Sequence, residues 1–269
     1  MCPPSSQVIR SSFLIHAASY VWRLVGTALS FALFGLGGLI LGCVIIPVRA
    51  VFIRDAERRI TGTRQLFGSA MRFFISFMAA MGVLRFQIEG MEHVRDDENY
   101  LILANHPSLI DVVFLIACFP QAVCVVKQAI FDNPFTRRAV RLAGYLSNHD
   151  PAEMLAGAEQ RLKKGRSLIL FPEGTRTTPG APLRFQQAAA AIAVRADQLC
   201  LPILIDVQPT TLTKADRWFH VPAEPVCFRM IVQPPLRPLE NLGHNPDKRR
   251  PDRDFNRYLL AYFEERLVA

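Results

Sequence analysis

Charged side chains are scarce in this 269-residue chain: Asp, Glu, Lys and Arg make up 20% of it, whereas 51% of the residues are hydrophobic. The mean hydropathy is positive, at +0.20. This composition excludes an intrinsically disordered chain and is unusual for a wholly soluble domain. The apolar residues are concentrated near the N-terminus, so we expect a membrane-associated segment followed by a folded domain.

Patterns that hold disulfides, metals or nucleic acids are missing. The cysteines form no C-x-x-C pair and mostly lie in apolar runs, which predicts reduced thiols: Cys2, Cys43, Cys118, Cys124, Cys200 and Cys227. Five histidines lack ligand-like spacing, so we predict no metal and no bound cofactor: His16, His93, His149, His220 and His244. The net charge of +8 comes without an RNA- or DNA-binding motif. We therefore expect it to attract anionic lipid head groups and acidic substrates.

Residues 24–48 contain no charge at all and lie between Arg23 and Arg49. A helix of this length can cross a hydrocarbon core about 30 Å thick. A cleavable secretory signal fits less well, because the run is too long and no small-residue cleavage site follows it. A buried core helix is the other alternative. We predict a membrane helix, and its glycines and Pro47 leave open whether it spans the bilayer or bends back within one leaflet.

Basic residues follow this apolar run. Six arginines and two acidic residues lie between Arg49 and Arg72, whereas the segment before the run holds Arg10 and Arg23. The positive-inside rule therefore predicts a protein of the cytoplasmic (inner) membrane with its C-terminal bulk in the cytosol.

A second apolar run covers residues 66–84 and is interrupted by Arg72. It could form a second membrane segment, but we favour an amphipathic helix lying in the membrane interface. The composition becomes ordinary near Glu89. We therefore predict a membrane-anchoring region over residues 1–88 and a cytosolic α/β domain over residues 89–269, which is long enough for one core.

Short β-rich runs alternate with helical patterns in the predicted domain. The runs lie at 85–89, 100–105, 122–127, 167–171, 201–207 and 226–232. Helices are expected between them at 109–118, 134–143, 151–164, 184–198 and 252–267. Strands separated by helices predict a mostly parallel sheet flanked by helices on both faces.

The first chemical motif is LANHPSLIDVVFL. It places His106 at a strand-to-helix turn and Asp111 in the first turn of the following helix, where the helix dipole stabilises a carboxylate. A histidine held by a carboxylate keeps one tautomer and can accept a proton on its other nitrogen. The simpler alternative is a helix-capping Asp near an unrelated His. We expect Ser108 to be a first-turn helix residue and not a nucleophile.

The second motif is SLILFPEGTRT, in which a buried strand leads into a polar turn. Arg176 offers a bidentate fork, and backbone amides around Gly174 and Thr175 can also face an anion. Glu173 could pair with this arginine or bind a substrate hydroxyl. The alternative is a polar turn with a structural Glu–Arg pair.

Together, NHPSLIDV and FPEGTRT resemble the PlsC-like lysophospholipid acyltransferases, from about Phe86 to Asp206. The resemblance implies transfer of a fatty acyl group from acyl-CoA or acyl-carrier protein to a hydroxyl of a membrane lipid, with the active site facing the cytosol. It implies His106 as the general base and Asp111 as the group that orients it. It also implies that Glu173, Gly174, Thr175 and Arg176 help to bind the acceptor phosphate, with Lys127 as a further basic contact.

The chain departs from the family pattern at two positions. Asp150 stands where the second block of the family has an arginine, and Ala188 stands where a glycine is usual. Arg137, Arg138 and Arg141 could supply the missing basic contact, although a solvated helix face is the simpler interpretation. The acceptor therefore stays open between a lysophospholipid such as 1-acylglycerol 3-phosphate and another lipid: an amino-acid lipid, a lipopolysaccharide precursor or a polyene product. A non-catalytic lipid-binding protein and a hydrolase are the alternatives from other classes.

Overall fold

The computed structural model describes residues 5–214, 216, 221–222, 224–241 and 250–267, and the side chains among them from residue 18 onward. Cys2, His220 and His244 lie outside the described residues. The chain begins with α1 (Ser5–Ile40), the π-helical η1 (Leu41–Ile45), α2 (Ile46–Phe52), α3 (Ala56–Ala80), β1 (Leu84–Glu89) and η2 (Met91–His93). It continues with β2 (Leu101–Ala104), α4 (Asp111–Cys118), β3 (Val123–Val126), α5 (Gln128–Asp132), α6 (Arg137–Leu142) and β4 (Leu146–Ser147). The last elements are α7 (Pro151–Lys163), β5 (Leu168–Leu170), α8 (Gln187–Ala196), β6 (Cys200–Gln208), β7 (Val226–Val232) and α9 (Pro251–Leu267).

The strands form one seven-stranded sheet in the order β1-β7-β6-β2-β5-β3-β4. Neighbouring strands are parallel except for β6 and β7, which are antiparallel. All six predicted strands are present, and the two-residue β4 is an addition. The helix predicted at 134–143 is present as the shorter α6, and a further short helix, α5, precedes it. The predicted α/β class with a mostly parallel sheet is thus confirmed.

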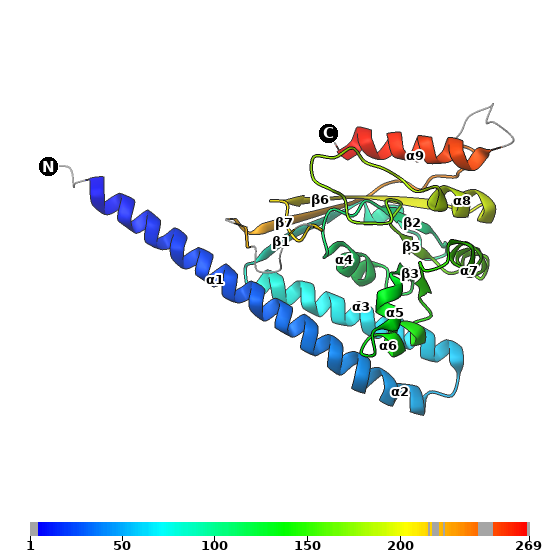
Figure 1. The fold of residues 1–269 in the computed structure, drawn as a ribbon, viewed down its shortest axis with the longest axis horizontal. Helices are drawn as coiled ribbons and strands as arrows, with labels where there is room; N and C mark the ends of the chain where they lie inside the picture. The colour runs from blue at the N-terminus through cyan, green and yellow to red at the C-terminus, as the bar shows by residue number, and fades with distance from the viewer. Residues whose placement is uncertain (1–4, 215, 217–220, 223, 242–249, 268–269) are drawn as a thin grey trace.

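Helices cover both faces of the sheet (Figure 1). Alternate residues of β2 point to opposite faces, as strand geometry requires. Ile102 joins a core that includes residues of α3 and α4, whereas Leu101 joins a second core that includes Phe255 and Phe263 of α9. Because β2 is buried on both faces, the loop at its carboxyl end is attached to a strand packed on both sides.

One helix among the described residues, Ala18–Phe52, is long and apolar enough to cross a membrane. It runs alongside α3 and projects beyond the sheet domain (Figure 1). One side contacts the protein, where Ser30, Leu41 and Ile46 are buried. Large apolar side chains on the rest of its surface are exposed, among them Leu29, Leu36, Val44, Val51 and Phe52. The predicted N-terminal apolar helix is therefore present as a continuous helical segment with an uncovered apolar surface, and its insertion in a membrane stays a prediction.

The second apolar run does not form a separate membrane segment. Its first part lies in α3, whose Phe74, Ile75 and Met78 are buried in the core shared with α4. Nη1 of Arg72, the one charge in the run, donates a hydrogen bond to the carbonyl of Ala117 at 2.9 Å. The run ends in β1, so the predicted boundary between residues 88 and 89 falls inside a strand that pairs with β7. Composition alone does not separate the two cases, because a helix packed on a sheet is as apolar on one face as an interfacial helix.

Candidate active site

The two sequence motifs meet at one edge of the sheet. β2 and β5 are adjacent and parallel, so the turns that follow them emerge side by side. The first turn carries His106 and the second carries Glu173, and two hydrogen bonds join them. The amide of His106 donates to Oε1 of Glu173 at 2.9 Å, and the amide of Thr177 donates to the carbonyl of His106 at 2.7 Å.

His106 and Asp111 form a hydrogen-bonded pair, with 2.8 Å between Nδ1 of the imidazole and Oδ2 of the carboxyl. Asp111 opens α4 and is fully buried, and its Oδ2 also accepts a hydrogen bond from the amide of Ser108 at 2.8 Å. The ring of Phe171 stacks on the imidazole with 4.0 Å between centroids. These contacts fix the ring, while 17% of the His106 side chain stays accessible. Nε2 has no hydrogen bond to any described residue, which leaves this nitrogen available to a substrate hydroxyl.

Burial raises the pKa of Asp111 to about 6, although its hydrogen bond and charge interaction with His106 lower it. The other carboxyl oxygen, Oδ1, is buried without a hydrogen-bond partner among the described residues. A buried carboxylate is costly unless a cation or several donors stabilise it. The carboxylate form of Asp111 is therefore stabilised most when His106 carries a positive charge. The ring is in this state after it has accepted a proton.

Glu173 holds the two motifs together. Its Oε1 accepts hydrogen bonds from the His106 amide and, at 2.7 Å, from Oγ1 of Thr177. Burial raises the pKa of Glu173, whereas these hydrogen bonds lower it to a smaller extent. Gly174 adopts a left-handed conformation with φ of 67°, and its amide donates to the carbonyl of Phe171, so the chain turns back sharply after the strand. None of the described ion pairs joins Glu173 to Arg176, so the alternative of a structural Glu–Arg pair is not formed.

Arg176 points to a neighbouring loop. Its Nη1 donates to the carbonyls of Leu212 and Thr213, both at 2.8 Å. The other predicted residues of the phosphate site, Thr175 and Lys127, are exposed. Lys127 follows β3, whose carboxyl end lies at the same edge of the sheet as those of β2 and β5. The predicted binding residues thus share one edge, and their role in binding phosphate stays a prediction.

The loop after β6, residues 209–213, also supports the site, and the sequence analysis missed it. Oγ of Ser108 donates to the carbonyl of Thr211 at 3.0 Å, and the amide of Leu109 donates to the carbonyl of Leu212 at 3.2 Å. Together with Arg176, these contacts fasten the loop to both motifs. Ser108 lies before α4 and not, as predicted, in its first turn, and its buried hydroxyl makes a structural contact. Pro209 was the only local signal for a turn here.

Asn105 is a second residue that sequence reasoning missed. Its side chain extends the pairing of β2 with β6: Nδ2 donates to the carbonyl of Ile205, and Oδ1 accepts from the amide of Ile205, both at 2.8 Å. The side chain is buried next to His106 in the chain. An asparagine directly before the histidine was the available signal. Its paired contacts fix the backbone from which the His106 side chain projects.

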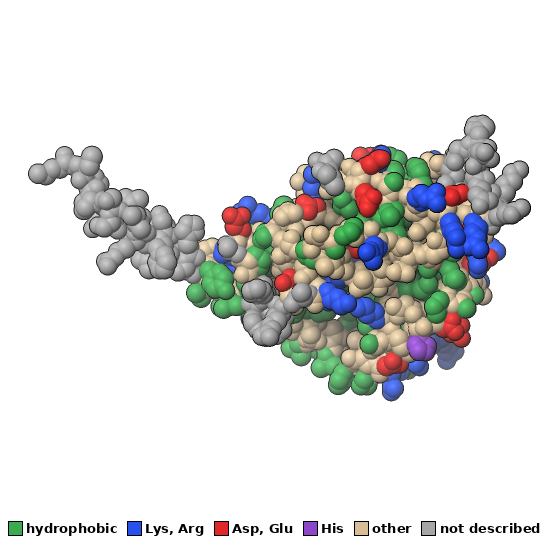
Figure 2. All heavy atoms as spheres, turned by 45° about the horizontal axis from the view of Figure 1, so that its top comes forward, with side chains coloured by type: hydrophobic (Ala, Val, Ile, Leu, Met, Phe, Trp, Pro, Cys, Tyr) green, Lys and Arg blue, Asp and Glu red, His purple; other side chains and the backbone are tan. Residues whose placement is uncertain are grey.

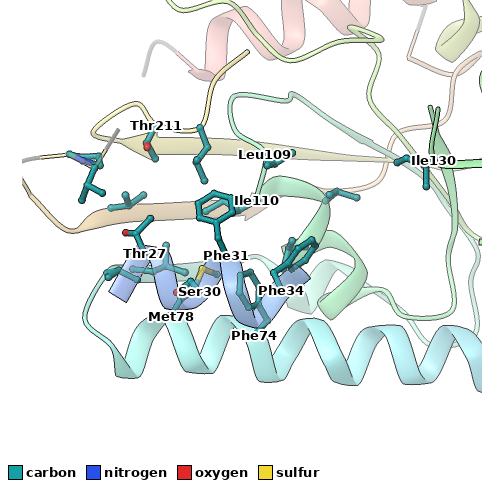
Figure 3. Close-up of a pocket in the computed structure, with 18 residues that line it drawn as sticks. Thr27, Ser30, Phe31, Phe34, Phe74, Met78, Leu109, Ile110, Ile130 and Thr211 are labelled. Atoms are coloured by element: carbon teal, nitrogen blue, oxygen red, sulfur yellow. The ribbon is translucent and has the colours of Figure 1, made fainter. Parts of the chain in front are cut away.

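An apolar cavity of about 310 Å³ lies beside this site. Phe31 and Phe34 of α1 and Phe74 and Met78 of α3 line it together with Ile110, as Figure 3 shows. Other lining residues are Leu109, Thr211 and Leu212, from the two loops described above. The cavity therefore reaches the turn that carries His106, between the apolar N-terminal helix and the sheet domain.

Asp150, the departure from the family pattern, caps a helix. Its Oδ1 accepts hydrogen bonds from the amides of Ala152 and Glu153 at the start of α7, at 2.7 and 3.3 Å. An arginine could not accept these bonds. Arg137, Arg138 and Arg141 are exposed on α6. Among the described residues, no group of three or more His, Cys, Asp or Glu side chains could hold a metal ion.

Comparison with known proteins decides the family. The family model named "Acyltransferase" matches residues 85–206, nearly the range over which the motifs suggested a resemblance. Residues 85–206 are an acyltransferase-family domain. The predicted resemblance to the PlsC-like acyltransferases is confirmed.

Curated relatives of this domain carry the name 1-acyl-sn-glycerol-3-phosphate acyltransferase. The protein of that name from Helicobacter pylori is 30% identical over 45% of this chain and 51% of its own length. The Pseudomonas aeruginosa protein is 28% identical over 71% of this chain and 66% of its own length. The mouse alpha enzyme is 25% identical over 78% of this chain and 70% of its own. The chain thus spans between 51% and 70% of the length of these relatives.

A solved structure supports the fold. The 1-acyl-sn-glycerophosphate acyltransferase PlsC from Thermotoga maritima matches with a TM-score of 0.70, covering 93% of this chain and 97% of its own, at 19% identity. At this identity the match concerns the fold alone. It includes the N-terminal helices, since almost the whole chain is covered.

Proposed function

We propose that this protein transfers a fatty acyl group from acyl-CoA or acyl-carrier protein to a hydroxyl of a lysophospholipid such as 1-acylglycerol 3-phosphate. The names of the relatives support the reaction. The hydrogen-bonded pair of His106 and Asp111, with Nε2 uncommitted, is the observation that carries the proposal. Such a pair activates a hydroxyl, and in this reaction the substrate itself supplies that hydroxyl.

In the proposed reaction, His106 is the general base. Nε2 accepts the proton of the acceptor hydroxyl while the oxygen attacks the thioester carbonyl. The buried carboxylate of Asp111 stabilises the imidazolium that forms and holds the proton on Nδ1. The imidazolium can then return its proton to the departing thiolate, so the products are an ester and a free thiol. No protein nucleophile is needed, in agreement with the structural role of Ser108.

The apolar cavity is proposed to hold an acyl chain. Its lining consists mostly of apolar side chains, from α1, α3, the start of α4 and neighbouring strands and loops, and it includes Leu109 and Ile110, close to His106 in the chain. Burying a methylene group from water contributes about 0.8 kcal/mol, so a cavity of this kind can bind a long chain firmly. The N-terminal helix would then serve both as membrane anchor and as one wall of the substrate site.

The acceptor phosphate is proposed to lie near Arg176 and Lys127. Only Nη1 of Arg176 donates to the loop, so the guanidinium retains other donors. Glu173, Gly174 and Thr175 shape the turn that presents Arg176. Because Asp150 caps α7 where the family pattern has an arginine, a lipid acceptor without a phosphate monoester is the second candidate.

The site is proposed to lie at the cytosolic surface of the cytoplasmic membrane. The exposed apolar surface of α1 and α2 supports membrane attachment. The arginines that follow this helix support a cytosolic domain. A lipid acceptor can then reach His106 without leaving the bilayer.

The test uses the purified full chain in mixed micelles, with either acyl-CoA or acyl-carrier protein as donor. Each donor is combined with 1-acylglycerol 3-phosphate or with lysolipids of other head groups, and products are identified by mass spectrometry. We expect a diacyl product in the wild type and a loss of about 10²- to 10⁴-fold in rate in His106→Ala. Release of fatty acid without a new ester would indicate a hydrolase. Binding of lipid without turnover would indicate a lipid-binding protein.

A further inference from the structure

We propose that α6 carries a binding surface for the head groups of anionic membrane phospholipids, separate from the acyl-transfer site. Arg137, Arg138 and Arg141 line an open hollow together with Leu142. We call these three arginines the α6 basic surface. The proposed function assigns them no role, and their contribution can be measured without acyl transfer.

The α6 basic surface concentrates positive charge without a counter-charge. All three side chains are exposed, and none forms an ion pair or a side-chain hydrogen bond with another described residue. Arg141 lies one helical turn after Arg137 and Arg138, a spacing at which like charges repel each other. An anion between them would remove this repulsion. Guanidinium groups favour phosphate because their paired donors match its oxygens.

Exposed apolar side chains lie next to this surface. Phe135, just before α6, is 57% exposed, and Val51 and Phe52 at the end of α2 are 73% and 81% exposed. The segment of Phe135 and α6 contacts the segment formed by η1 and α2. Sγ of Cys43 in η1 lies 3.8 Å from the carbonyl oxygen of Phe135, and α6 packs on both η1 and α2. Aromatic and aliphatic side chains exposed beside arginines are typical of surfaces that lie in a membrane interface.

This combination favours a lipid surface over an acidic protein as the partner. The α6 basic surface is continuous with the candidate membrane helix, since Gly42 of that helix packs so closely on α6 that a Cβ there would lie 2.9 Å from the carbonyl of Phe135. When the apolar surface of α2 enters the bilayer, the arginines come to the level of the phosphates. On the opposite side of the sheet, around α9, basic and acidic side chains are interspersed (Figure 2). Anionic lipid would thus set which side of the domain faces the membrane.

The test compares the wild type with R137Q/R138Q/R141Q and with the control R250Q/R253Q/R257Q. The control removes three exposed arginines at and near the start of α9. Full-length protein is diluted from detergent into phosphatidylcholine vesicles with or without phosphatidylglycerol, and bound protein is separated by flotation. We expect the wild type and the control to prefer the anionic vesicles, with a preference that decreases as salt is added. The α6 variant should lose this preference by about tenfold, while its binding to neutral vesicles is unchanged.

Three results would overturn the proposal. The α6 variant could keep the preference for anionic vesicles, or the control could lose as much of it as the α6 variant. Alternatively, the α6 variant could bind vesicles normally but show a raised KM for acyl-carrier protein and not for acyl-CoA, which would make this a carrier-protein surface. Circular dichroism melts show whether each variant is folded. Because flotation needs no turnover, a failure of the proposed acyl transfer would leave this test intact.

Discussion

The backbone amide of His106 donates a hydrogen bond of 2.9 Å to Oε1 of Glu173, which lies 67 residues later in the chain. A carboxylate from the second motif thereby fixes the peptide that carries the imidazole of the first. The return bond from the Thr177 amide to the His106 carbonyl makes the connection two-sided. The two motifs are therefore one structural unit, and the position of the base depends on both.

Glu173→Ala should lower both stability and activity. The substitution leaves the His106 amide and the Thr177 hydroxyl without their acceptor, at a cost of about 1–3 kcal/mol in the free energy of unfolding. Glu173→Gln keeps an accepting oxygen and should retain most of the stability. Thermal melts and kcat/KM of the two variants measure this difference. Equal stability of the alanine variant and the wild type would contradict the role given to Glu173.

Asp111→Asn should impair the chemical step more than substrate binding. An amide can donate to Nδ1 of His106, which would favour the tautomer with its proton on Nε2, where it cannot accept one. We expect kcat to fall by about 10³- to 10⁴-fold with little change in KM. The variant should stay folded, since a neutral side chain replaces a buried carboxyl. A kcat above about a tenth of the wild-type value would contradict the proposed role of the pair.

The pH dependence of kcat/KM should show an acid limb near pH 6. The pKa of Asp111 is raised to about 6, so its carboxyl becomes protonated as the pH falls through this value. A protonated Asp111 no longer stabilises the imidazolium, and activity is lost on the acid side. Because His106 and Asp111 titrate together, the apparent pKa of the acid limb belongs to the pair and not to one residue alone. A profile that stays flat down to pH 5 would contradict this account.

Filling the apolar cavity should change the preferred acyl chain. Thr27 lines the cavity from α1, and Thr27→Phe reduces its length or width. Each methylene that no longer fits should lower kcat/KM for the longer donor about fourfold relative to the shorter one. Leu29→Phe, on the exposed side of the same helix, is the matched control and should leave the ratio unchanged. Donors of graded chain length in competition give the ratio directly.

The regular part of the fold and the His–Asp pair followed from local sequence. Strands such as 226–232 are apolar runs bounded by turn-forming or polar residues, and the first-turn position of Asp111 follows from the spacing of NHPSLID. Strand-to-helix turns at the carboxyl edge of a parallel sheet place ligand-binding residues in a way that alternation alone predicts. His106 and Glu173 could therefore be placed at one edge without coordinates.

Long-range contacts were beyond such prediction. Arg176 donates to carbonyls 36 and 37 residues later in the chain, in a loop without a distinctive motif. The stacking of Phe171 on His106 likewise depends on how two adjacent strands end. The pairing of β1 with β7, which begins only at Val226, is a third such contact. In each case the deciding interaction joins segments whose local composition contains no information about the other.

Label transfer from a labelled acyl thioester to a membrane lipid extract tests the central claim most directly. The detergent-solubilised protein and its His106→Ala variant are each given acyl-CoA and acyl-carrier-protein donors, and the labelled products are separated. The account predicts label in a lipid ester with intact His106 and a loss of about 10²-fold or more in the variant. Label found equally with both proteins, or only in free fatty acid, would contradict it.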